Sequence, residues 1–210
     1  MVKIIIADDH AIVREGLKQI LTKVQDLTAV GEAANGNELL EKVRASNWDV
    51  VLLDLNMPGL NGLDTLKQLR SERPGLRVLV LSMYPEEQYA LRVLKAGASG
   101  YLTKETAPEQ LVDAIRTVST GRKYISASLA ERLAFEFEID FEKPPHGKLS
   151  DREYQVLLLI ASGQSVKEIA AALALSVKSI STYRTRLLQK MNMKNNADLI
   201  HYAIENHLLG

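Results

Sequence analysis

Three aspartates that follow short aliphatic stretches are the residues of this sequence best suited to chemistry. Residues 50–53 precede Asp54, and residues 3–7 precede Asp8 and Asp9. Uninterrupted aliphatic runs of this length are typical of strands buried on both faces, as in a parallel sheet. Because open α/β sheets bind their ligands at the carboxyl edge of the strands, the sequence predicts three carboxylates at one such edge.

A hydroxyl and an ammonium group follow two further predicted strands. Ser82 comes after residues 77–81, and Lys104 comes shortly after residues 99–102. Clustered carboxylates repel one another and favour a hard divalent cation with oxygen ligands, such as Mg²⁺. Asp54 would then attack phosphorus and form an acyl phosphate, while Lys104 and Ser82 bind the phosphoryl oxygens. The set predicts a phosphoacceptor site that needs neither histidine nor cysteine.

Each of these residues also has a purely structural explanation. Asp8 or Asp9 would cap the following helix, and for either residue taken alone this is the favoured interpretation. Ser82 would belong to a turn, Lys104 to a solvated strand end and Asp54 to a loop. Their shared position at one edge of the inferred sheet favours the phosphoacceptor hypothesis.

Strands and helices alternate over the first 120 residues. Apolar residues at helical spacing predict helices over residues 11–24, 36–45, 63–72, 86–96 and 108–120. The strands expected between them span residues 3–7, 28–34, 49–53, 77–81 and 99–102. Five such alternations predict a doubly wound, five-stranded parallel sheet of flavodoxin-like type with helices on both faces. Thr106 and Glu109 predict a capping box for the last helix.

Composition and charge divide the chain into residues 1–120, a linker over residues 121–147 and a third part over residues 148–210. The chain as a whole has no net charge, yet the third part holds eight Lys and Arg against five Asp and Glu. The linker contains Pro144-Pro145 and a predicted helix over residues 126–137. The helix would be capped by Ser126 or Ser128.

The whole composition is that of a globular chain, with 46% hydrophobic and 25% charged residues, which excludes a disordered chain. The absence of cysteine excludes disulfides and thiolate metal sites. No apolar run approaches the roughly 20 residues that a membrane span needs. We therefore expect a cytoplasmic protein that has no signal peptide and does not contact a membrane.

Residues 148–210 are predicted to be all helical. Ser150 with Glu153, and Ser165 with Glu168, have the spacing of capping boxes and predict two helix starts. The helices are expected to span residues 151–161, 166–173, 177–191 and 197–206. Two short helices joined by a tight turn and followed by a longer one predict a helix-turn-helix module.

The helix predicted over residues 177–191 has two unlike faces. On one side lie Val177, Ile180, Leu187, Leu188 and Met191. On the other side lie Lys178, Thr182, Thr185, Arg186 and Gln189. Residues 176–191 include four basic residues and no acidic one. Such a face suits phosphate and base-edge contacts in the major groove, whereas a merely solvated face usually mixes both charges.

The first part of the chain resembles the receiver domain of two-component response regulators. The resemblance rests on Ala7-Asp8-Asp9-His10, Asp54-Leu55-Asn56-Met57-Pro58 with Gly62, Ser82, and Tyr101 three residues before Lys104. One departure is Glu105, where many receivers have proline, and it affects only the local peptide geometry.

This resemblance implies roles for individual residues. Asp54 would be the phosphoacceptor, and Mg²⁺ would be bound by Asp9, Asp54 and the backbone carbonyl of Asn56, with Asp8 in the outer shell. Lys104 and the Ser82 hydroxyl would bind the phosphoryl group, and Tyr101 would follow Ser82 inward as a switch. The sequence does not choose between the inward and the outward orientation of Tyr101.

The third part resembles the LuxR-type helix-turn-helix domain. The matching residues include Leu149-Ser150-Asp151-Arg152-Glu153, Lys167-Glu168-Ile169-Ala170 and Leu175-Ser176-Val177-Lys178-Ser179-Ile180. The resemblance implies that Ser181, Thr182 and Thr185 face bases, and that Lys167, Lys178 and Arg186 favour phosphates. Tyr183 stands where the family often has histidine.

Together the two parts have the layout of the NarL/FixJ group of response regulators. This layout implies a regulator of transcription that is not an enzyme and whose Asp54 is phosphorylated by a histidine kinase or a small phosphodonor. It also implies double-stranded DNA and a second copy of the chain as partners, with RNA polymerase as a further candidate. A surface for the dimer is expected on the last helix, at Leu199, Ile200, Tyr202, Ala203 and Ile204, unless these residues pack in the core.

Two other classes of function fit parts of the sequence. A Mg²⁺-dependent phosphohydrolase also forms an aspartyl phosphate, but such enzymes commonly place a general acid two residues after the nucleophile, and Asn56 stands there. A regulator that ignores phosphate and responds to partner proteins would be expected to have lost the motif set that this chain retains.

Overall fold

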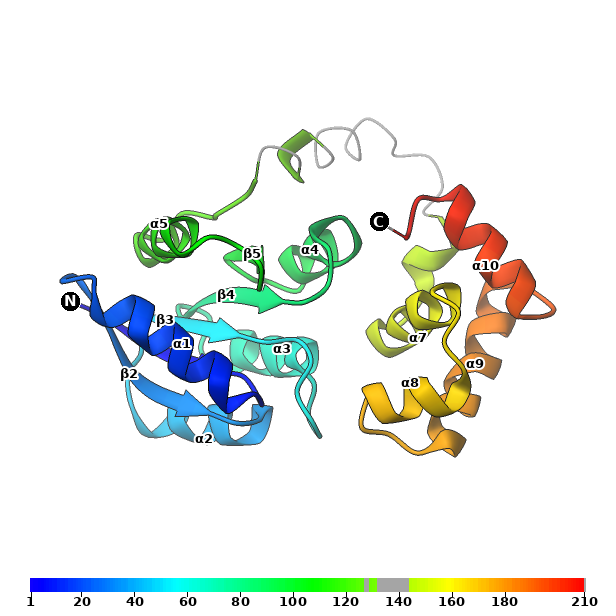
Figure 1. Ribbon diagram of the computed structural model, residues 1–210, viewed down its shortest axis with the longest axis horizontal. Coiled ribbons are helices and arrows are strands. Elements are labelled where there is room, and N and C mark those ends of the chain that lie inside the picture. Colours follow the sequence, from blue (N-terminus) through cyan, green and yellow to red (C-terminus); the bar gives the residue numbers. More distant parts are fainter. Residues whose placement is uncertain (127–128, 132–143, 210) are drawn as a thin grey trace. The chain divides into compact units, whose positions relative to one another are not determined.

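The computed structural model describes residues 1–126, 129–131 and 144–209. The chain divides into two compact units, Met1–Glu131 and Arg132–Gly210. Figure 1 shows both units.

The N-terminal unit is built on five parallel strands, as predicted, and their order is β2-β1-β3-β4-β5. The strands are β1 (Val2–Ala7), β2 (Leu27–Ala33), β3 (Val50–Leu53), β4 (Arg77–Ser82) and β5 (Gly100–Thr103). The helices are α1 (Ala11–Thr22), α2 (Gly36–Ala45), α3 (Gly62–Glu72), α4 (Glu86–Lys95) and α5 (Pro108–Ser119). The helices lie on both sides of the sheet, which confirms the doubly wound fold (Figure 1).

The central strands are fully covered, which is why their sequences are uniformly aliphatic. All four residues of β3 are buried, and in β1 the last four are buried as well. One layer of the core joins alternate strand residues such as Ile4 and Leu52 to Leu21 of α1 and Ile115 of α5. Helices on both faces of a parallel sheet exclude water from every strand position, so no polar alternation is needed.

Two expectations for this unit are wrong in detail. The capping box at Thr106 and Glu109 does not form, because α5 begins at Pro108 after Ala107, and the cap residue has no side chain that accepts a hydrogen bond. Thr106 instead places its hydroxyl 3.3 Å from that of Thr103. Ile12 follows the helical pattern of α1 but is 84% exposed, so it does not contribute to the core.

The segment after α5 returns along the edge strand β5. Tyr124 forms a parallel bridge with Gly100, and its amide donates to the carbonyl of Ser99 over 2.8 Å. The Leu129 amide donates to the Ser126 hydroxyl over 3.1 Å, as expected for the predicted cap at Ser126. Most of the helix predicted over residues 126–137 lies outside the described residues, as does Ser128.

The C-terminal unit is helical, as predicted. After the short 3₁₀ helix η1 (Pro145–Lys148) come α7 (Asp151–Ala161), α8 (Val166–Ala172), α9 (Val177–Met191) and α10 (Asn196–Glu205). Both predicted capping boxes form, at Ser150 with Glu153 and at Ser165 with Glu168. Helix α7 is buried along nearly its whole length and contacts the other three. None of the helices that the structure describes is long and apolar enough to cross a membrane.

Candidate functional site: a carboxylate pocket and a basic helix

The sheet register brings the predicted site residues to one edge. The amide of Asp54 donates to the carbonyl of Ala7 over 2.8 Å, which sets Asp54 beside Asp8 at the next position of β1. The amide of Lys104 donates in the same way to the carbonyl of Ser82, also over 2.8 Å. Parallel pairing therefore places residues that are far apart in the sequence at the same level of neighbouring strands.

The Lys104 ammonium lies between two buried carboxylates. Its Nζ is 2.8 Å from Asp54 Oδ2 and 2.6 Å from Asp8 Oδ2. Both aspartates are 2% exposed, and the Lys104 side chain is 9% exposed. The single positive charge thus compensates part of the negative charge of a pair that would otherwise be buried without a counter-ion.

Asp54 keeps one oxygen without a donor. Among the described residues, no group donates to its buried Oδ1, while Lys104 occupies Oδ2. Burial raises the pKa of the Asp54 carboxyl above its usual range, against the opposing effect of the Lys104 ammonium. A buried carboxylate oxygen without a partner is unusual in a folded protein and indicates a position for a ligand.

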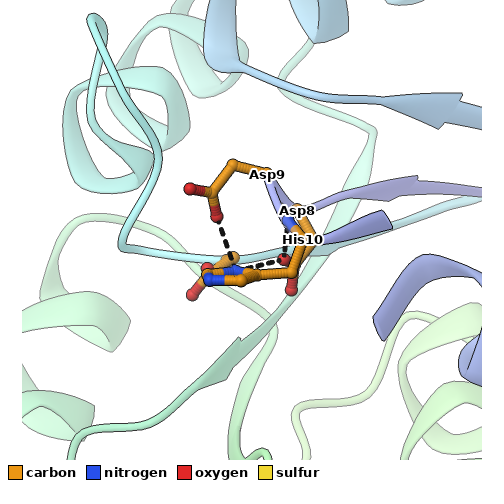
Figure 2. A group of neighbouring side chains, drawn as sticks. Asp8, Asp9 and His10 are labelled. Atoms are coloured by element: carbon orange, nitrogen blue, oxygen red, sulfur yellow. Dashed lines mark hydrogen bonds and ion pairs between the residues drawn. The ribbon is translucent and has the colours of Figure 1, made fainter. Parts of the chain in front are cut away.

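A second group of side chains lies next to this pair. The His10 ring places Nδ1 2.8 Å from Asp9 Oδ1 and 3.2 Å from Asp8 Oδ1 (Figure 2). Ligand atoms of Asp8, Asp9, His10 and Asp54 all lie within 4.8 Å of one another. Three carboxylates and an imidazole at this distance form an acidic cluster that can hold a metal ion.

The backbone around Asp54 depends on a close approach that only glycine permits. Gly62 begins α3 and its amide donates to the carbonyl of Leu55 over 3.1 Å. A Cβ atom at residue 62 would collide with the carbonyl oxygen of Asp54 and with the Leu55 backbone. The start of α3 therefore packs directly against the backbone of Asp54 and Leu55.

The predicted switch residues are buried beside the acceptor loop. Ser82 is fully buried, and its Oγ accepts a hydrogen bond from the amide of Tyr84 over 3.2 Å. Tyr101 is 2% exposed and its hydroxyl donates to the carbonyl of Tyr84 over 2.6 Å. Burial raises the pKa of the Tyr101 phenol, so the hydroxyl stays a donor at neutral pH. Of the two orientations that the sequence left open, the structure has the inward one.

Three further residues near Asp54 were assigned no role from the sequence, although His10 belongs to one of the quoted motifs. Tyr84 connects the loop after β4 to the loop after β3, because its hydroxyl donates to Asn56 Oδ1 over 3.3 Å. Arg14 donates to the carbonyl of Asp8 over 2.7 Å, and His10 contacts Asp8 and Asp9. The only sequence signal for them was proximity, since His10 follows Asp9 directly and Tyr84 is two residues from Ser82.

In the C-terminal unit, α9 exposes the face that the sequence predicted. All five α9 residues predicted to face DNA are exposed, namely Lys178, Ser181, Thr182, Thr185 and Arg186. Lys167 on α8 is exposed as well. On the opposite side Ile180, Leu187 and Met191 are buried. Val177 was expected on the buried side but is 48% exposed, because it is the first residue of the helix.

Two polar contacts hold α9 against its neighbours. The Lys190 ammonium is 2.7 Å from the carboxylate of Glu153 on α7, and Arg184 Nε donates to Asn196 Oδ1 on α10 over 2.6 Å. The five residues of α10 that were candidates for a dimer surface differ in exposure. Leu199 and Ala203 are fully buried in the core, Ile200 and Tyr202 are half-buried, and Ile204 is 58% exposed.

Comparison with known proteins agrees with this arrangement. The chain matches the response regulator receiver domain over residues 4–116 and the luxR family of bacterial regulatory proteins over residues 147–203. It is 36% identical to the response regulator UvrY of Escherichia coli K12 over 209 residues, which is 99% of this chain and 96% of UvrY. It is 40% identical to the oxygen regulatory protein NreC of Staphylococcus carnosus over 214 residues, which is 99% of both chains.

Solved structures give the same result. RcsB of Salmonella enterica serovar Typhimurium, bound to promoter rprA in the presence of phosphomimetic BeF3−, is 28% identical with a TM-score of 0.64, and the match covers 96% of this chain and 97% of RcsB. The response regulator ChrA of a heme-sensing two-component system is 30% identical with a TM-score of 0.53, and the match covers 99% of this chain and 98% of ChrA. The chain therefore belongs to the NarL/FixJ group of response regulators, which combine a receiver domain with a LuxR-type DNA-binding domain.

Proposed function

We propose that this protein regulates transcription and that phosphorylation of Asp54 controls its binding to DNA. The observation that carries the proposal is the state of the Asp54 carboxylate. It is buried at the carboxyl edge of the sheet, Lys104 holds Oδ2, and no described residue donates to Oδ1. A carboxylate with one oxygen anchored and the other without a donor is suited to nucleophilic attack on phosphorus.

In the reaction, an Asp54 oxygen forms a bond to phosphorus while the bond from phosphorus to the donor breaks. The donor is a phosphohistidine of a sensor kinase or a small acyl phosphate, and its former bridging atom leaves with the bonding electrons. Lys104 is close enough to bind a phosphoryl oxygen on Asp54, and the Ser82 hydroxyl lies at the end of the neighbouring strand. Such charge-assisted hydrogen bonds are stronger than neutral ones.

The acidic cluster fits a divalent cation of the Mg²⁺ type. Asp9, Asp54 and the backbone carbonyl of Asn56 are the proposed ligands, with Asp8 in the outer shell, as the resemblance to receiver domains implies. All of these donors are oxygens, which Mg²⁺ prefers, and the buried Oδ1 of Asp54 has no competing donor among the described residues. A bound Mg²⁺ would neutralise the charge that otherwise repels an incoming phosphate.

Intact-protein mass spectrometry tests the acceptor. Incubation with acetyl phosphate and Mg²⁺ should add one phosphoryl group to the wild-type protein, and a chelator or the change Asp54→Asn should prevent it. Asp113→Asn, which alters an exposed aspartate of α5, is the matched control and should be labelled like the wild type. Labelling of Asp54→Asn to the wild-type level would show that the acceptor is another residue.

The output is proposed to be double-stranded DNA, bound by α9. Its exposed face carries Lys178 and Arg186 and no carboxylate, and Lys167 adds a third cation from α8. Related proteins support this proposal, since RcsB was solved on promoter DNA and as dimers on DNA. We extend both features to this chain, so that phosphorylation favours a dimer whose two copies of α9 read paired half-sites.

Salt dependence tests the phosphate contacts. Arg186→Ala should weaken binding to all DNA sequences and lower the slope of log K against log salt by about 1. Lys23→Ala, an exposed lysine after α1, should leave the slope unchanged. The same slope for wild type and Arg186→Ala would exclude a phosphate contact at Arg186.

A further inference from the structure

The hydroxyl groups on the DNA-facing side of α9 are already used as donors. Ser181 Oγ donates to the carbonyl of Val177 over 2.9 Å, Thr182 Oγ1 to that of Lys178 over 3.0 Å, and Thr185 Oγ1 to that of Ser181 over 3.0 Å. Each bond runs to the residue one turn earlier in the helix. All three side chains are exposed, so the outward face of α9 repeats one conformation three times.

This conformation decides what the side chains can offer to a ligand. A hydroxyl has one hydrogen and two acceptor lone pairs. Because the hydrogen points to a helix carbonyl, the oxygen is left as an acceptor only. In threonine the same rotamer fixes the second branch of Cβ, so the methyl groups of Thr182 and Thr185 become the apolar features of the exposed face.

The base edges in the major groove differ in how they match such a surface. Guanine presents two acceptors, N7 and O6, and needs donors from the protein. Thymine presents a C5 methyl group, which packs against apolar groups. The methyl groups of Thr182 and Thr185 therefore match the C5 methyl of thymine, whereas the hydroxyl oxygens of these two residues, being acceptors, have nothing to offer N7 and O6 of guanine.

One of the two arginines of α9 is held by a contact within its own domain, while the other, Arg186, is assigned to a phosphate. Arg184 is half-buried and its Nε donates to Asn196 Oδ1 over 2.6 Å. Arginine reads guanine with two parallel donors, and an arginine held by its own domain offers that fork less readily. Arg184 is thus held to α10 while the threonines face outward.

We propose that Thr182 and Thr185 select thymine in the half-site by packing their methyl groups against the thymine C5 methyl. This inference rests on the proposed binding of α9 to DNA and adds which base the helix reads and with which chemical group. The hydroxyls act within the helix, where they hold the methyl groups in place. One buried methyl contact corresponds to about a fourfold change in affinity.

The test begins with selection of binding sites from randomised DNA by the full-length protein, phosphorylated with acetyl phosphate and Mg²⁺. The selected site should contain A·T pairs at the positions that respond to changes at Thr182 and Thr185. Replacing thymine by uracil at these positions removes only the C5 methyl and should weaken binding about fourfold per position. The same replacement outside the half-sites is the control and should change nothing.

Matched protein variants separate the methyl from the hydroxyl. Thr182→Val and Thr185→Val keep a methyl group at the same place, so they should still discriminate thymine from uracil. Thr182→Ser and Thr185→Ser keep the hydroxyl and lose the methyl, so the fourfold discrimination at the matching position should vanish. This double-mutant cycle assigns the coupling to one pair of methyl groups.

The outcomes distinguish the inference from the function on which it rests. Sequence-specific binding in which uracil replaces thymine without loss, or in which the valine variants lose discrimination and the serine variants keep it, would overturn the reading of thymine and leave DNA regulation intact. Guanine at the responding positions would do the same. Absence of specific DNA binding by the phosphorylated wild type would overturn the proposed function, and the reading of thymine with it.

Discussion

The Ser126 hydroxyl lies 2.7 Å from the Glu86 carboxylate, and this bond joins the segment after α5 to the first residue of α4. Glu86 follows Tyr84 by two residues, and the Tyr84 backbone is bonded to both Ser82 and Tyr101. The loop between β4 and α4 therefore contacts the edge of the sheet that carries Asp54 at one end, and Ser126 in the linker at the other. A shift of this loop would therefore act on Ser126 through its hydrogen bond to Glu86.

Ser126→Ala should loosen the start of the linker. The hydroxyl donates to Glu86 and accepts from the amide of Leu129, so the variant loses a bond to a carboxylate and a helix cap. Loss of a cap costs about 1 kcal/mol, which corresponds to roughly fivefold faster hydrogen exchange at the Leu129 amide. Ser119→Ala, whose hydroxyl donates to the Arg116 carbonyl within α5, is the control. Equal exchange in both variants and the wild type would contradict the cap.

Asp54→Asn should stabilise the receiver at neutral pH when no divalent cation is present. Burial raises the pKa of Asp54 in the folded state above the unfolded value of about 3.9. Below about pH 3.9 the Asp54 carboxyl is protonated in both states, so its burial does not reduce the free energy of unfolding. As the pH rises through the folded pKa, the buried group ionises and the free energy of unfolding falls. Asparagine carries no charge and escapes this loss.

Differential scanning calorimetry between pH 4 and pH 8 checks this prediction. The advantage of Asp54→Asn should grow with pH and reach on the order of 1 kcal/mol, which shifts Tm by about 2–4 °C. Asp113→Asn, at an exposed position of α5, should stay within about 0.5 kcal/mol at every pH. A variant that is less stable than the wild type at pH 7 would show that the Lys104 pair outweighs burial.

The position of Asp54 and its neighbours was predictable, because strand register follows from buried aliphatic runs and right-handed crossovers. Asp8, Asp54, Ser82 and Lys104 needed only a parallel sheet to meet at one edge. The orientation of Tyr101 was not predictable, since it depends on whether the Tyr84 carbonyl is within reach. The contacts of His10 and Arg14 depend on rotamers that no sequence pattern encodes.

The errors have similar causes. The capping box at Thr106 failed because Pro108 takes the first helical position, where its missing N–H costs nothing, so that the cap position falls on Ala107 and not on Thr106. Val177 and Ile12 are exposed although each follows the apolar spacing of its helix. Periodicity predicts which face of a helix is apolar, but it does not predict that residues near the start of the helix lie outside the core. The hydrogen bonds from the α9 hydroxyls to the helix carbonyls are a further detail that residue spacing does not encode.

Lys190→Met should destabilise the C-terminal unit in a pH-dependent way. Burial raises the pKa of Glu153, but the Lys190 ammonium and hydrogen bonds from Ser150 outweigh it and hold the pKa below its usual range. A lowered pKa contributes stability above the unfolded value of about 4.3, and this stability is lost as the pH falls through the folded pKa. The variant should lose about 1–3 kcal/mol at pH 7.

Urea unfolding followed by circular dichroism at pH 7 and at pH 4 measures this difference, which should shrink at the lower pH. Lys148→Met changes an exposed lysine just before α7 and is expected to have little effect at either pH. If Lys190→Met and Lys148→Met unfold at the same urea concentration at pH 7, the pair with Glu153 does not stabilise the fold.

Ala174→Gly should stabilise the turn between α8 and α9. Ala174 has φ +51°, in the left-handed region, where a Cβ atom is crowded by the backbone and costs about 1–2 kcal/mol. Glycine removes this strain but adds freedom to the unfolded chain, so the net gain should be about 0.5–1 kcal/mol. The matched control is Ala172→Gly at the exposed last residue of α8, which should lose up to about 1 kcal/mol because glycine is a poor helix former. Urea unfolding measures the change in the free energy of unfolding for both variants. Changes of opposite sign for two Ala→Gly substitutions only two residues apart would identify backbone conformation as the cause. A loss of stability in both variants would contradict a strained turn at Ala174.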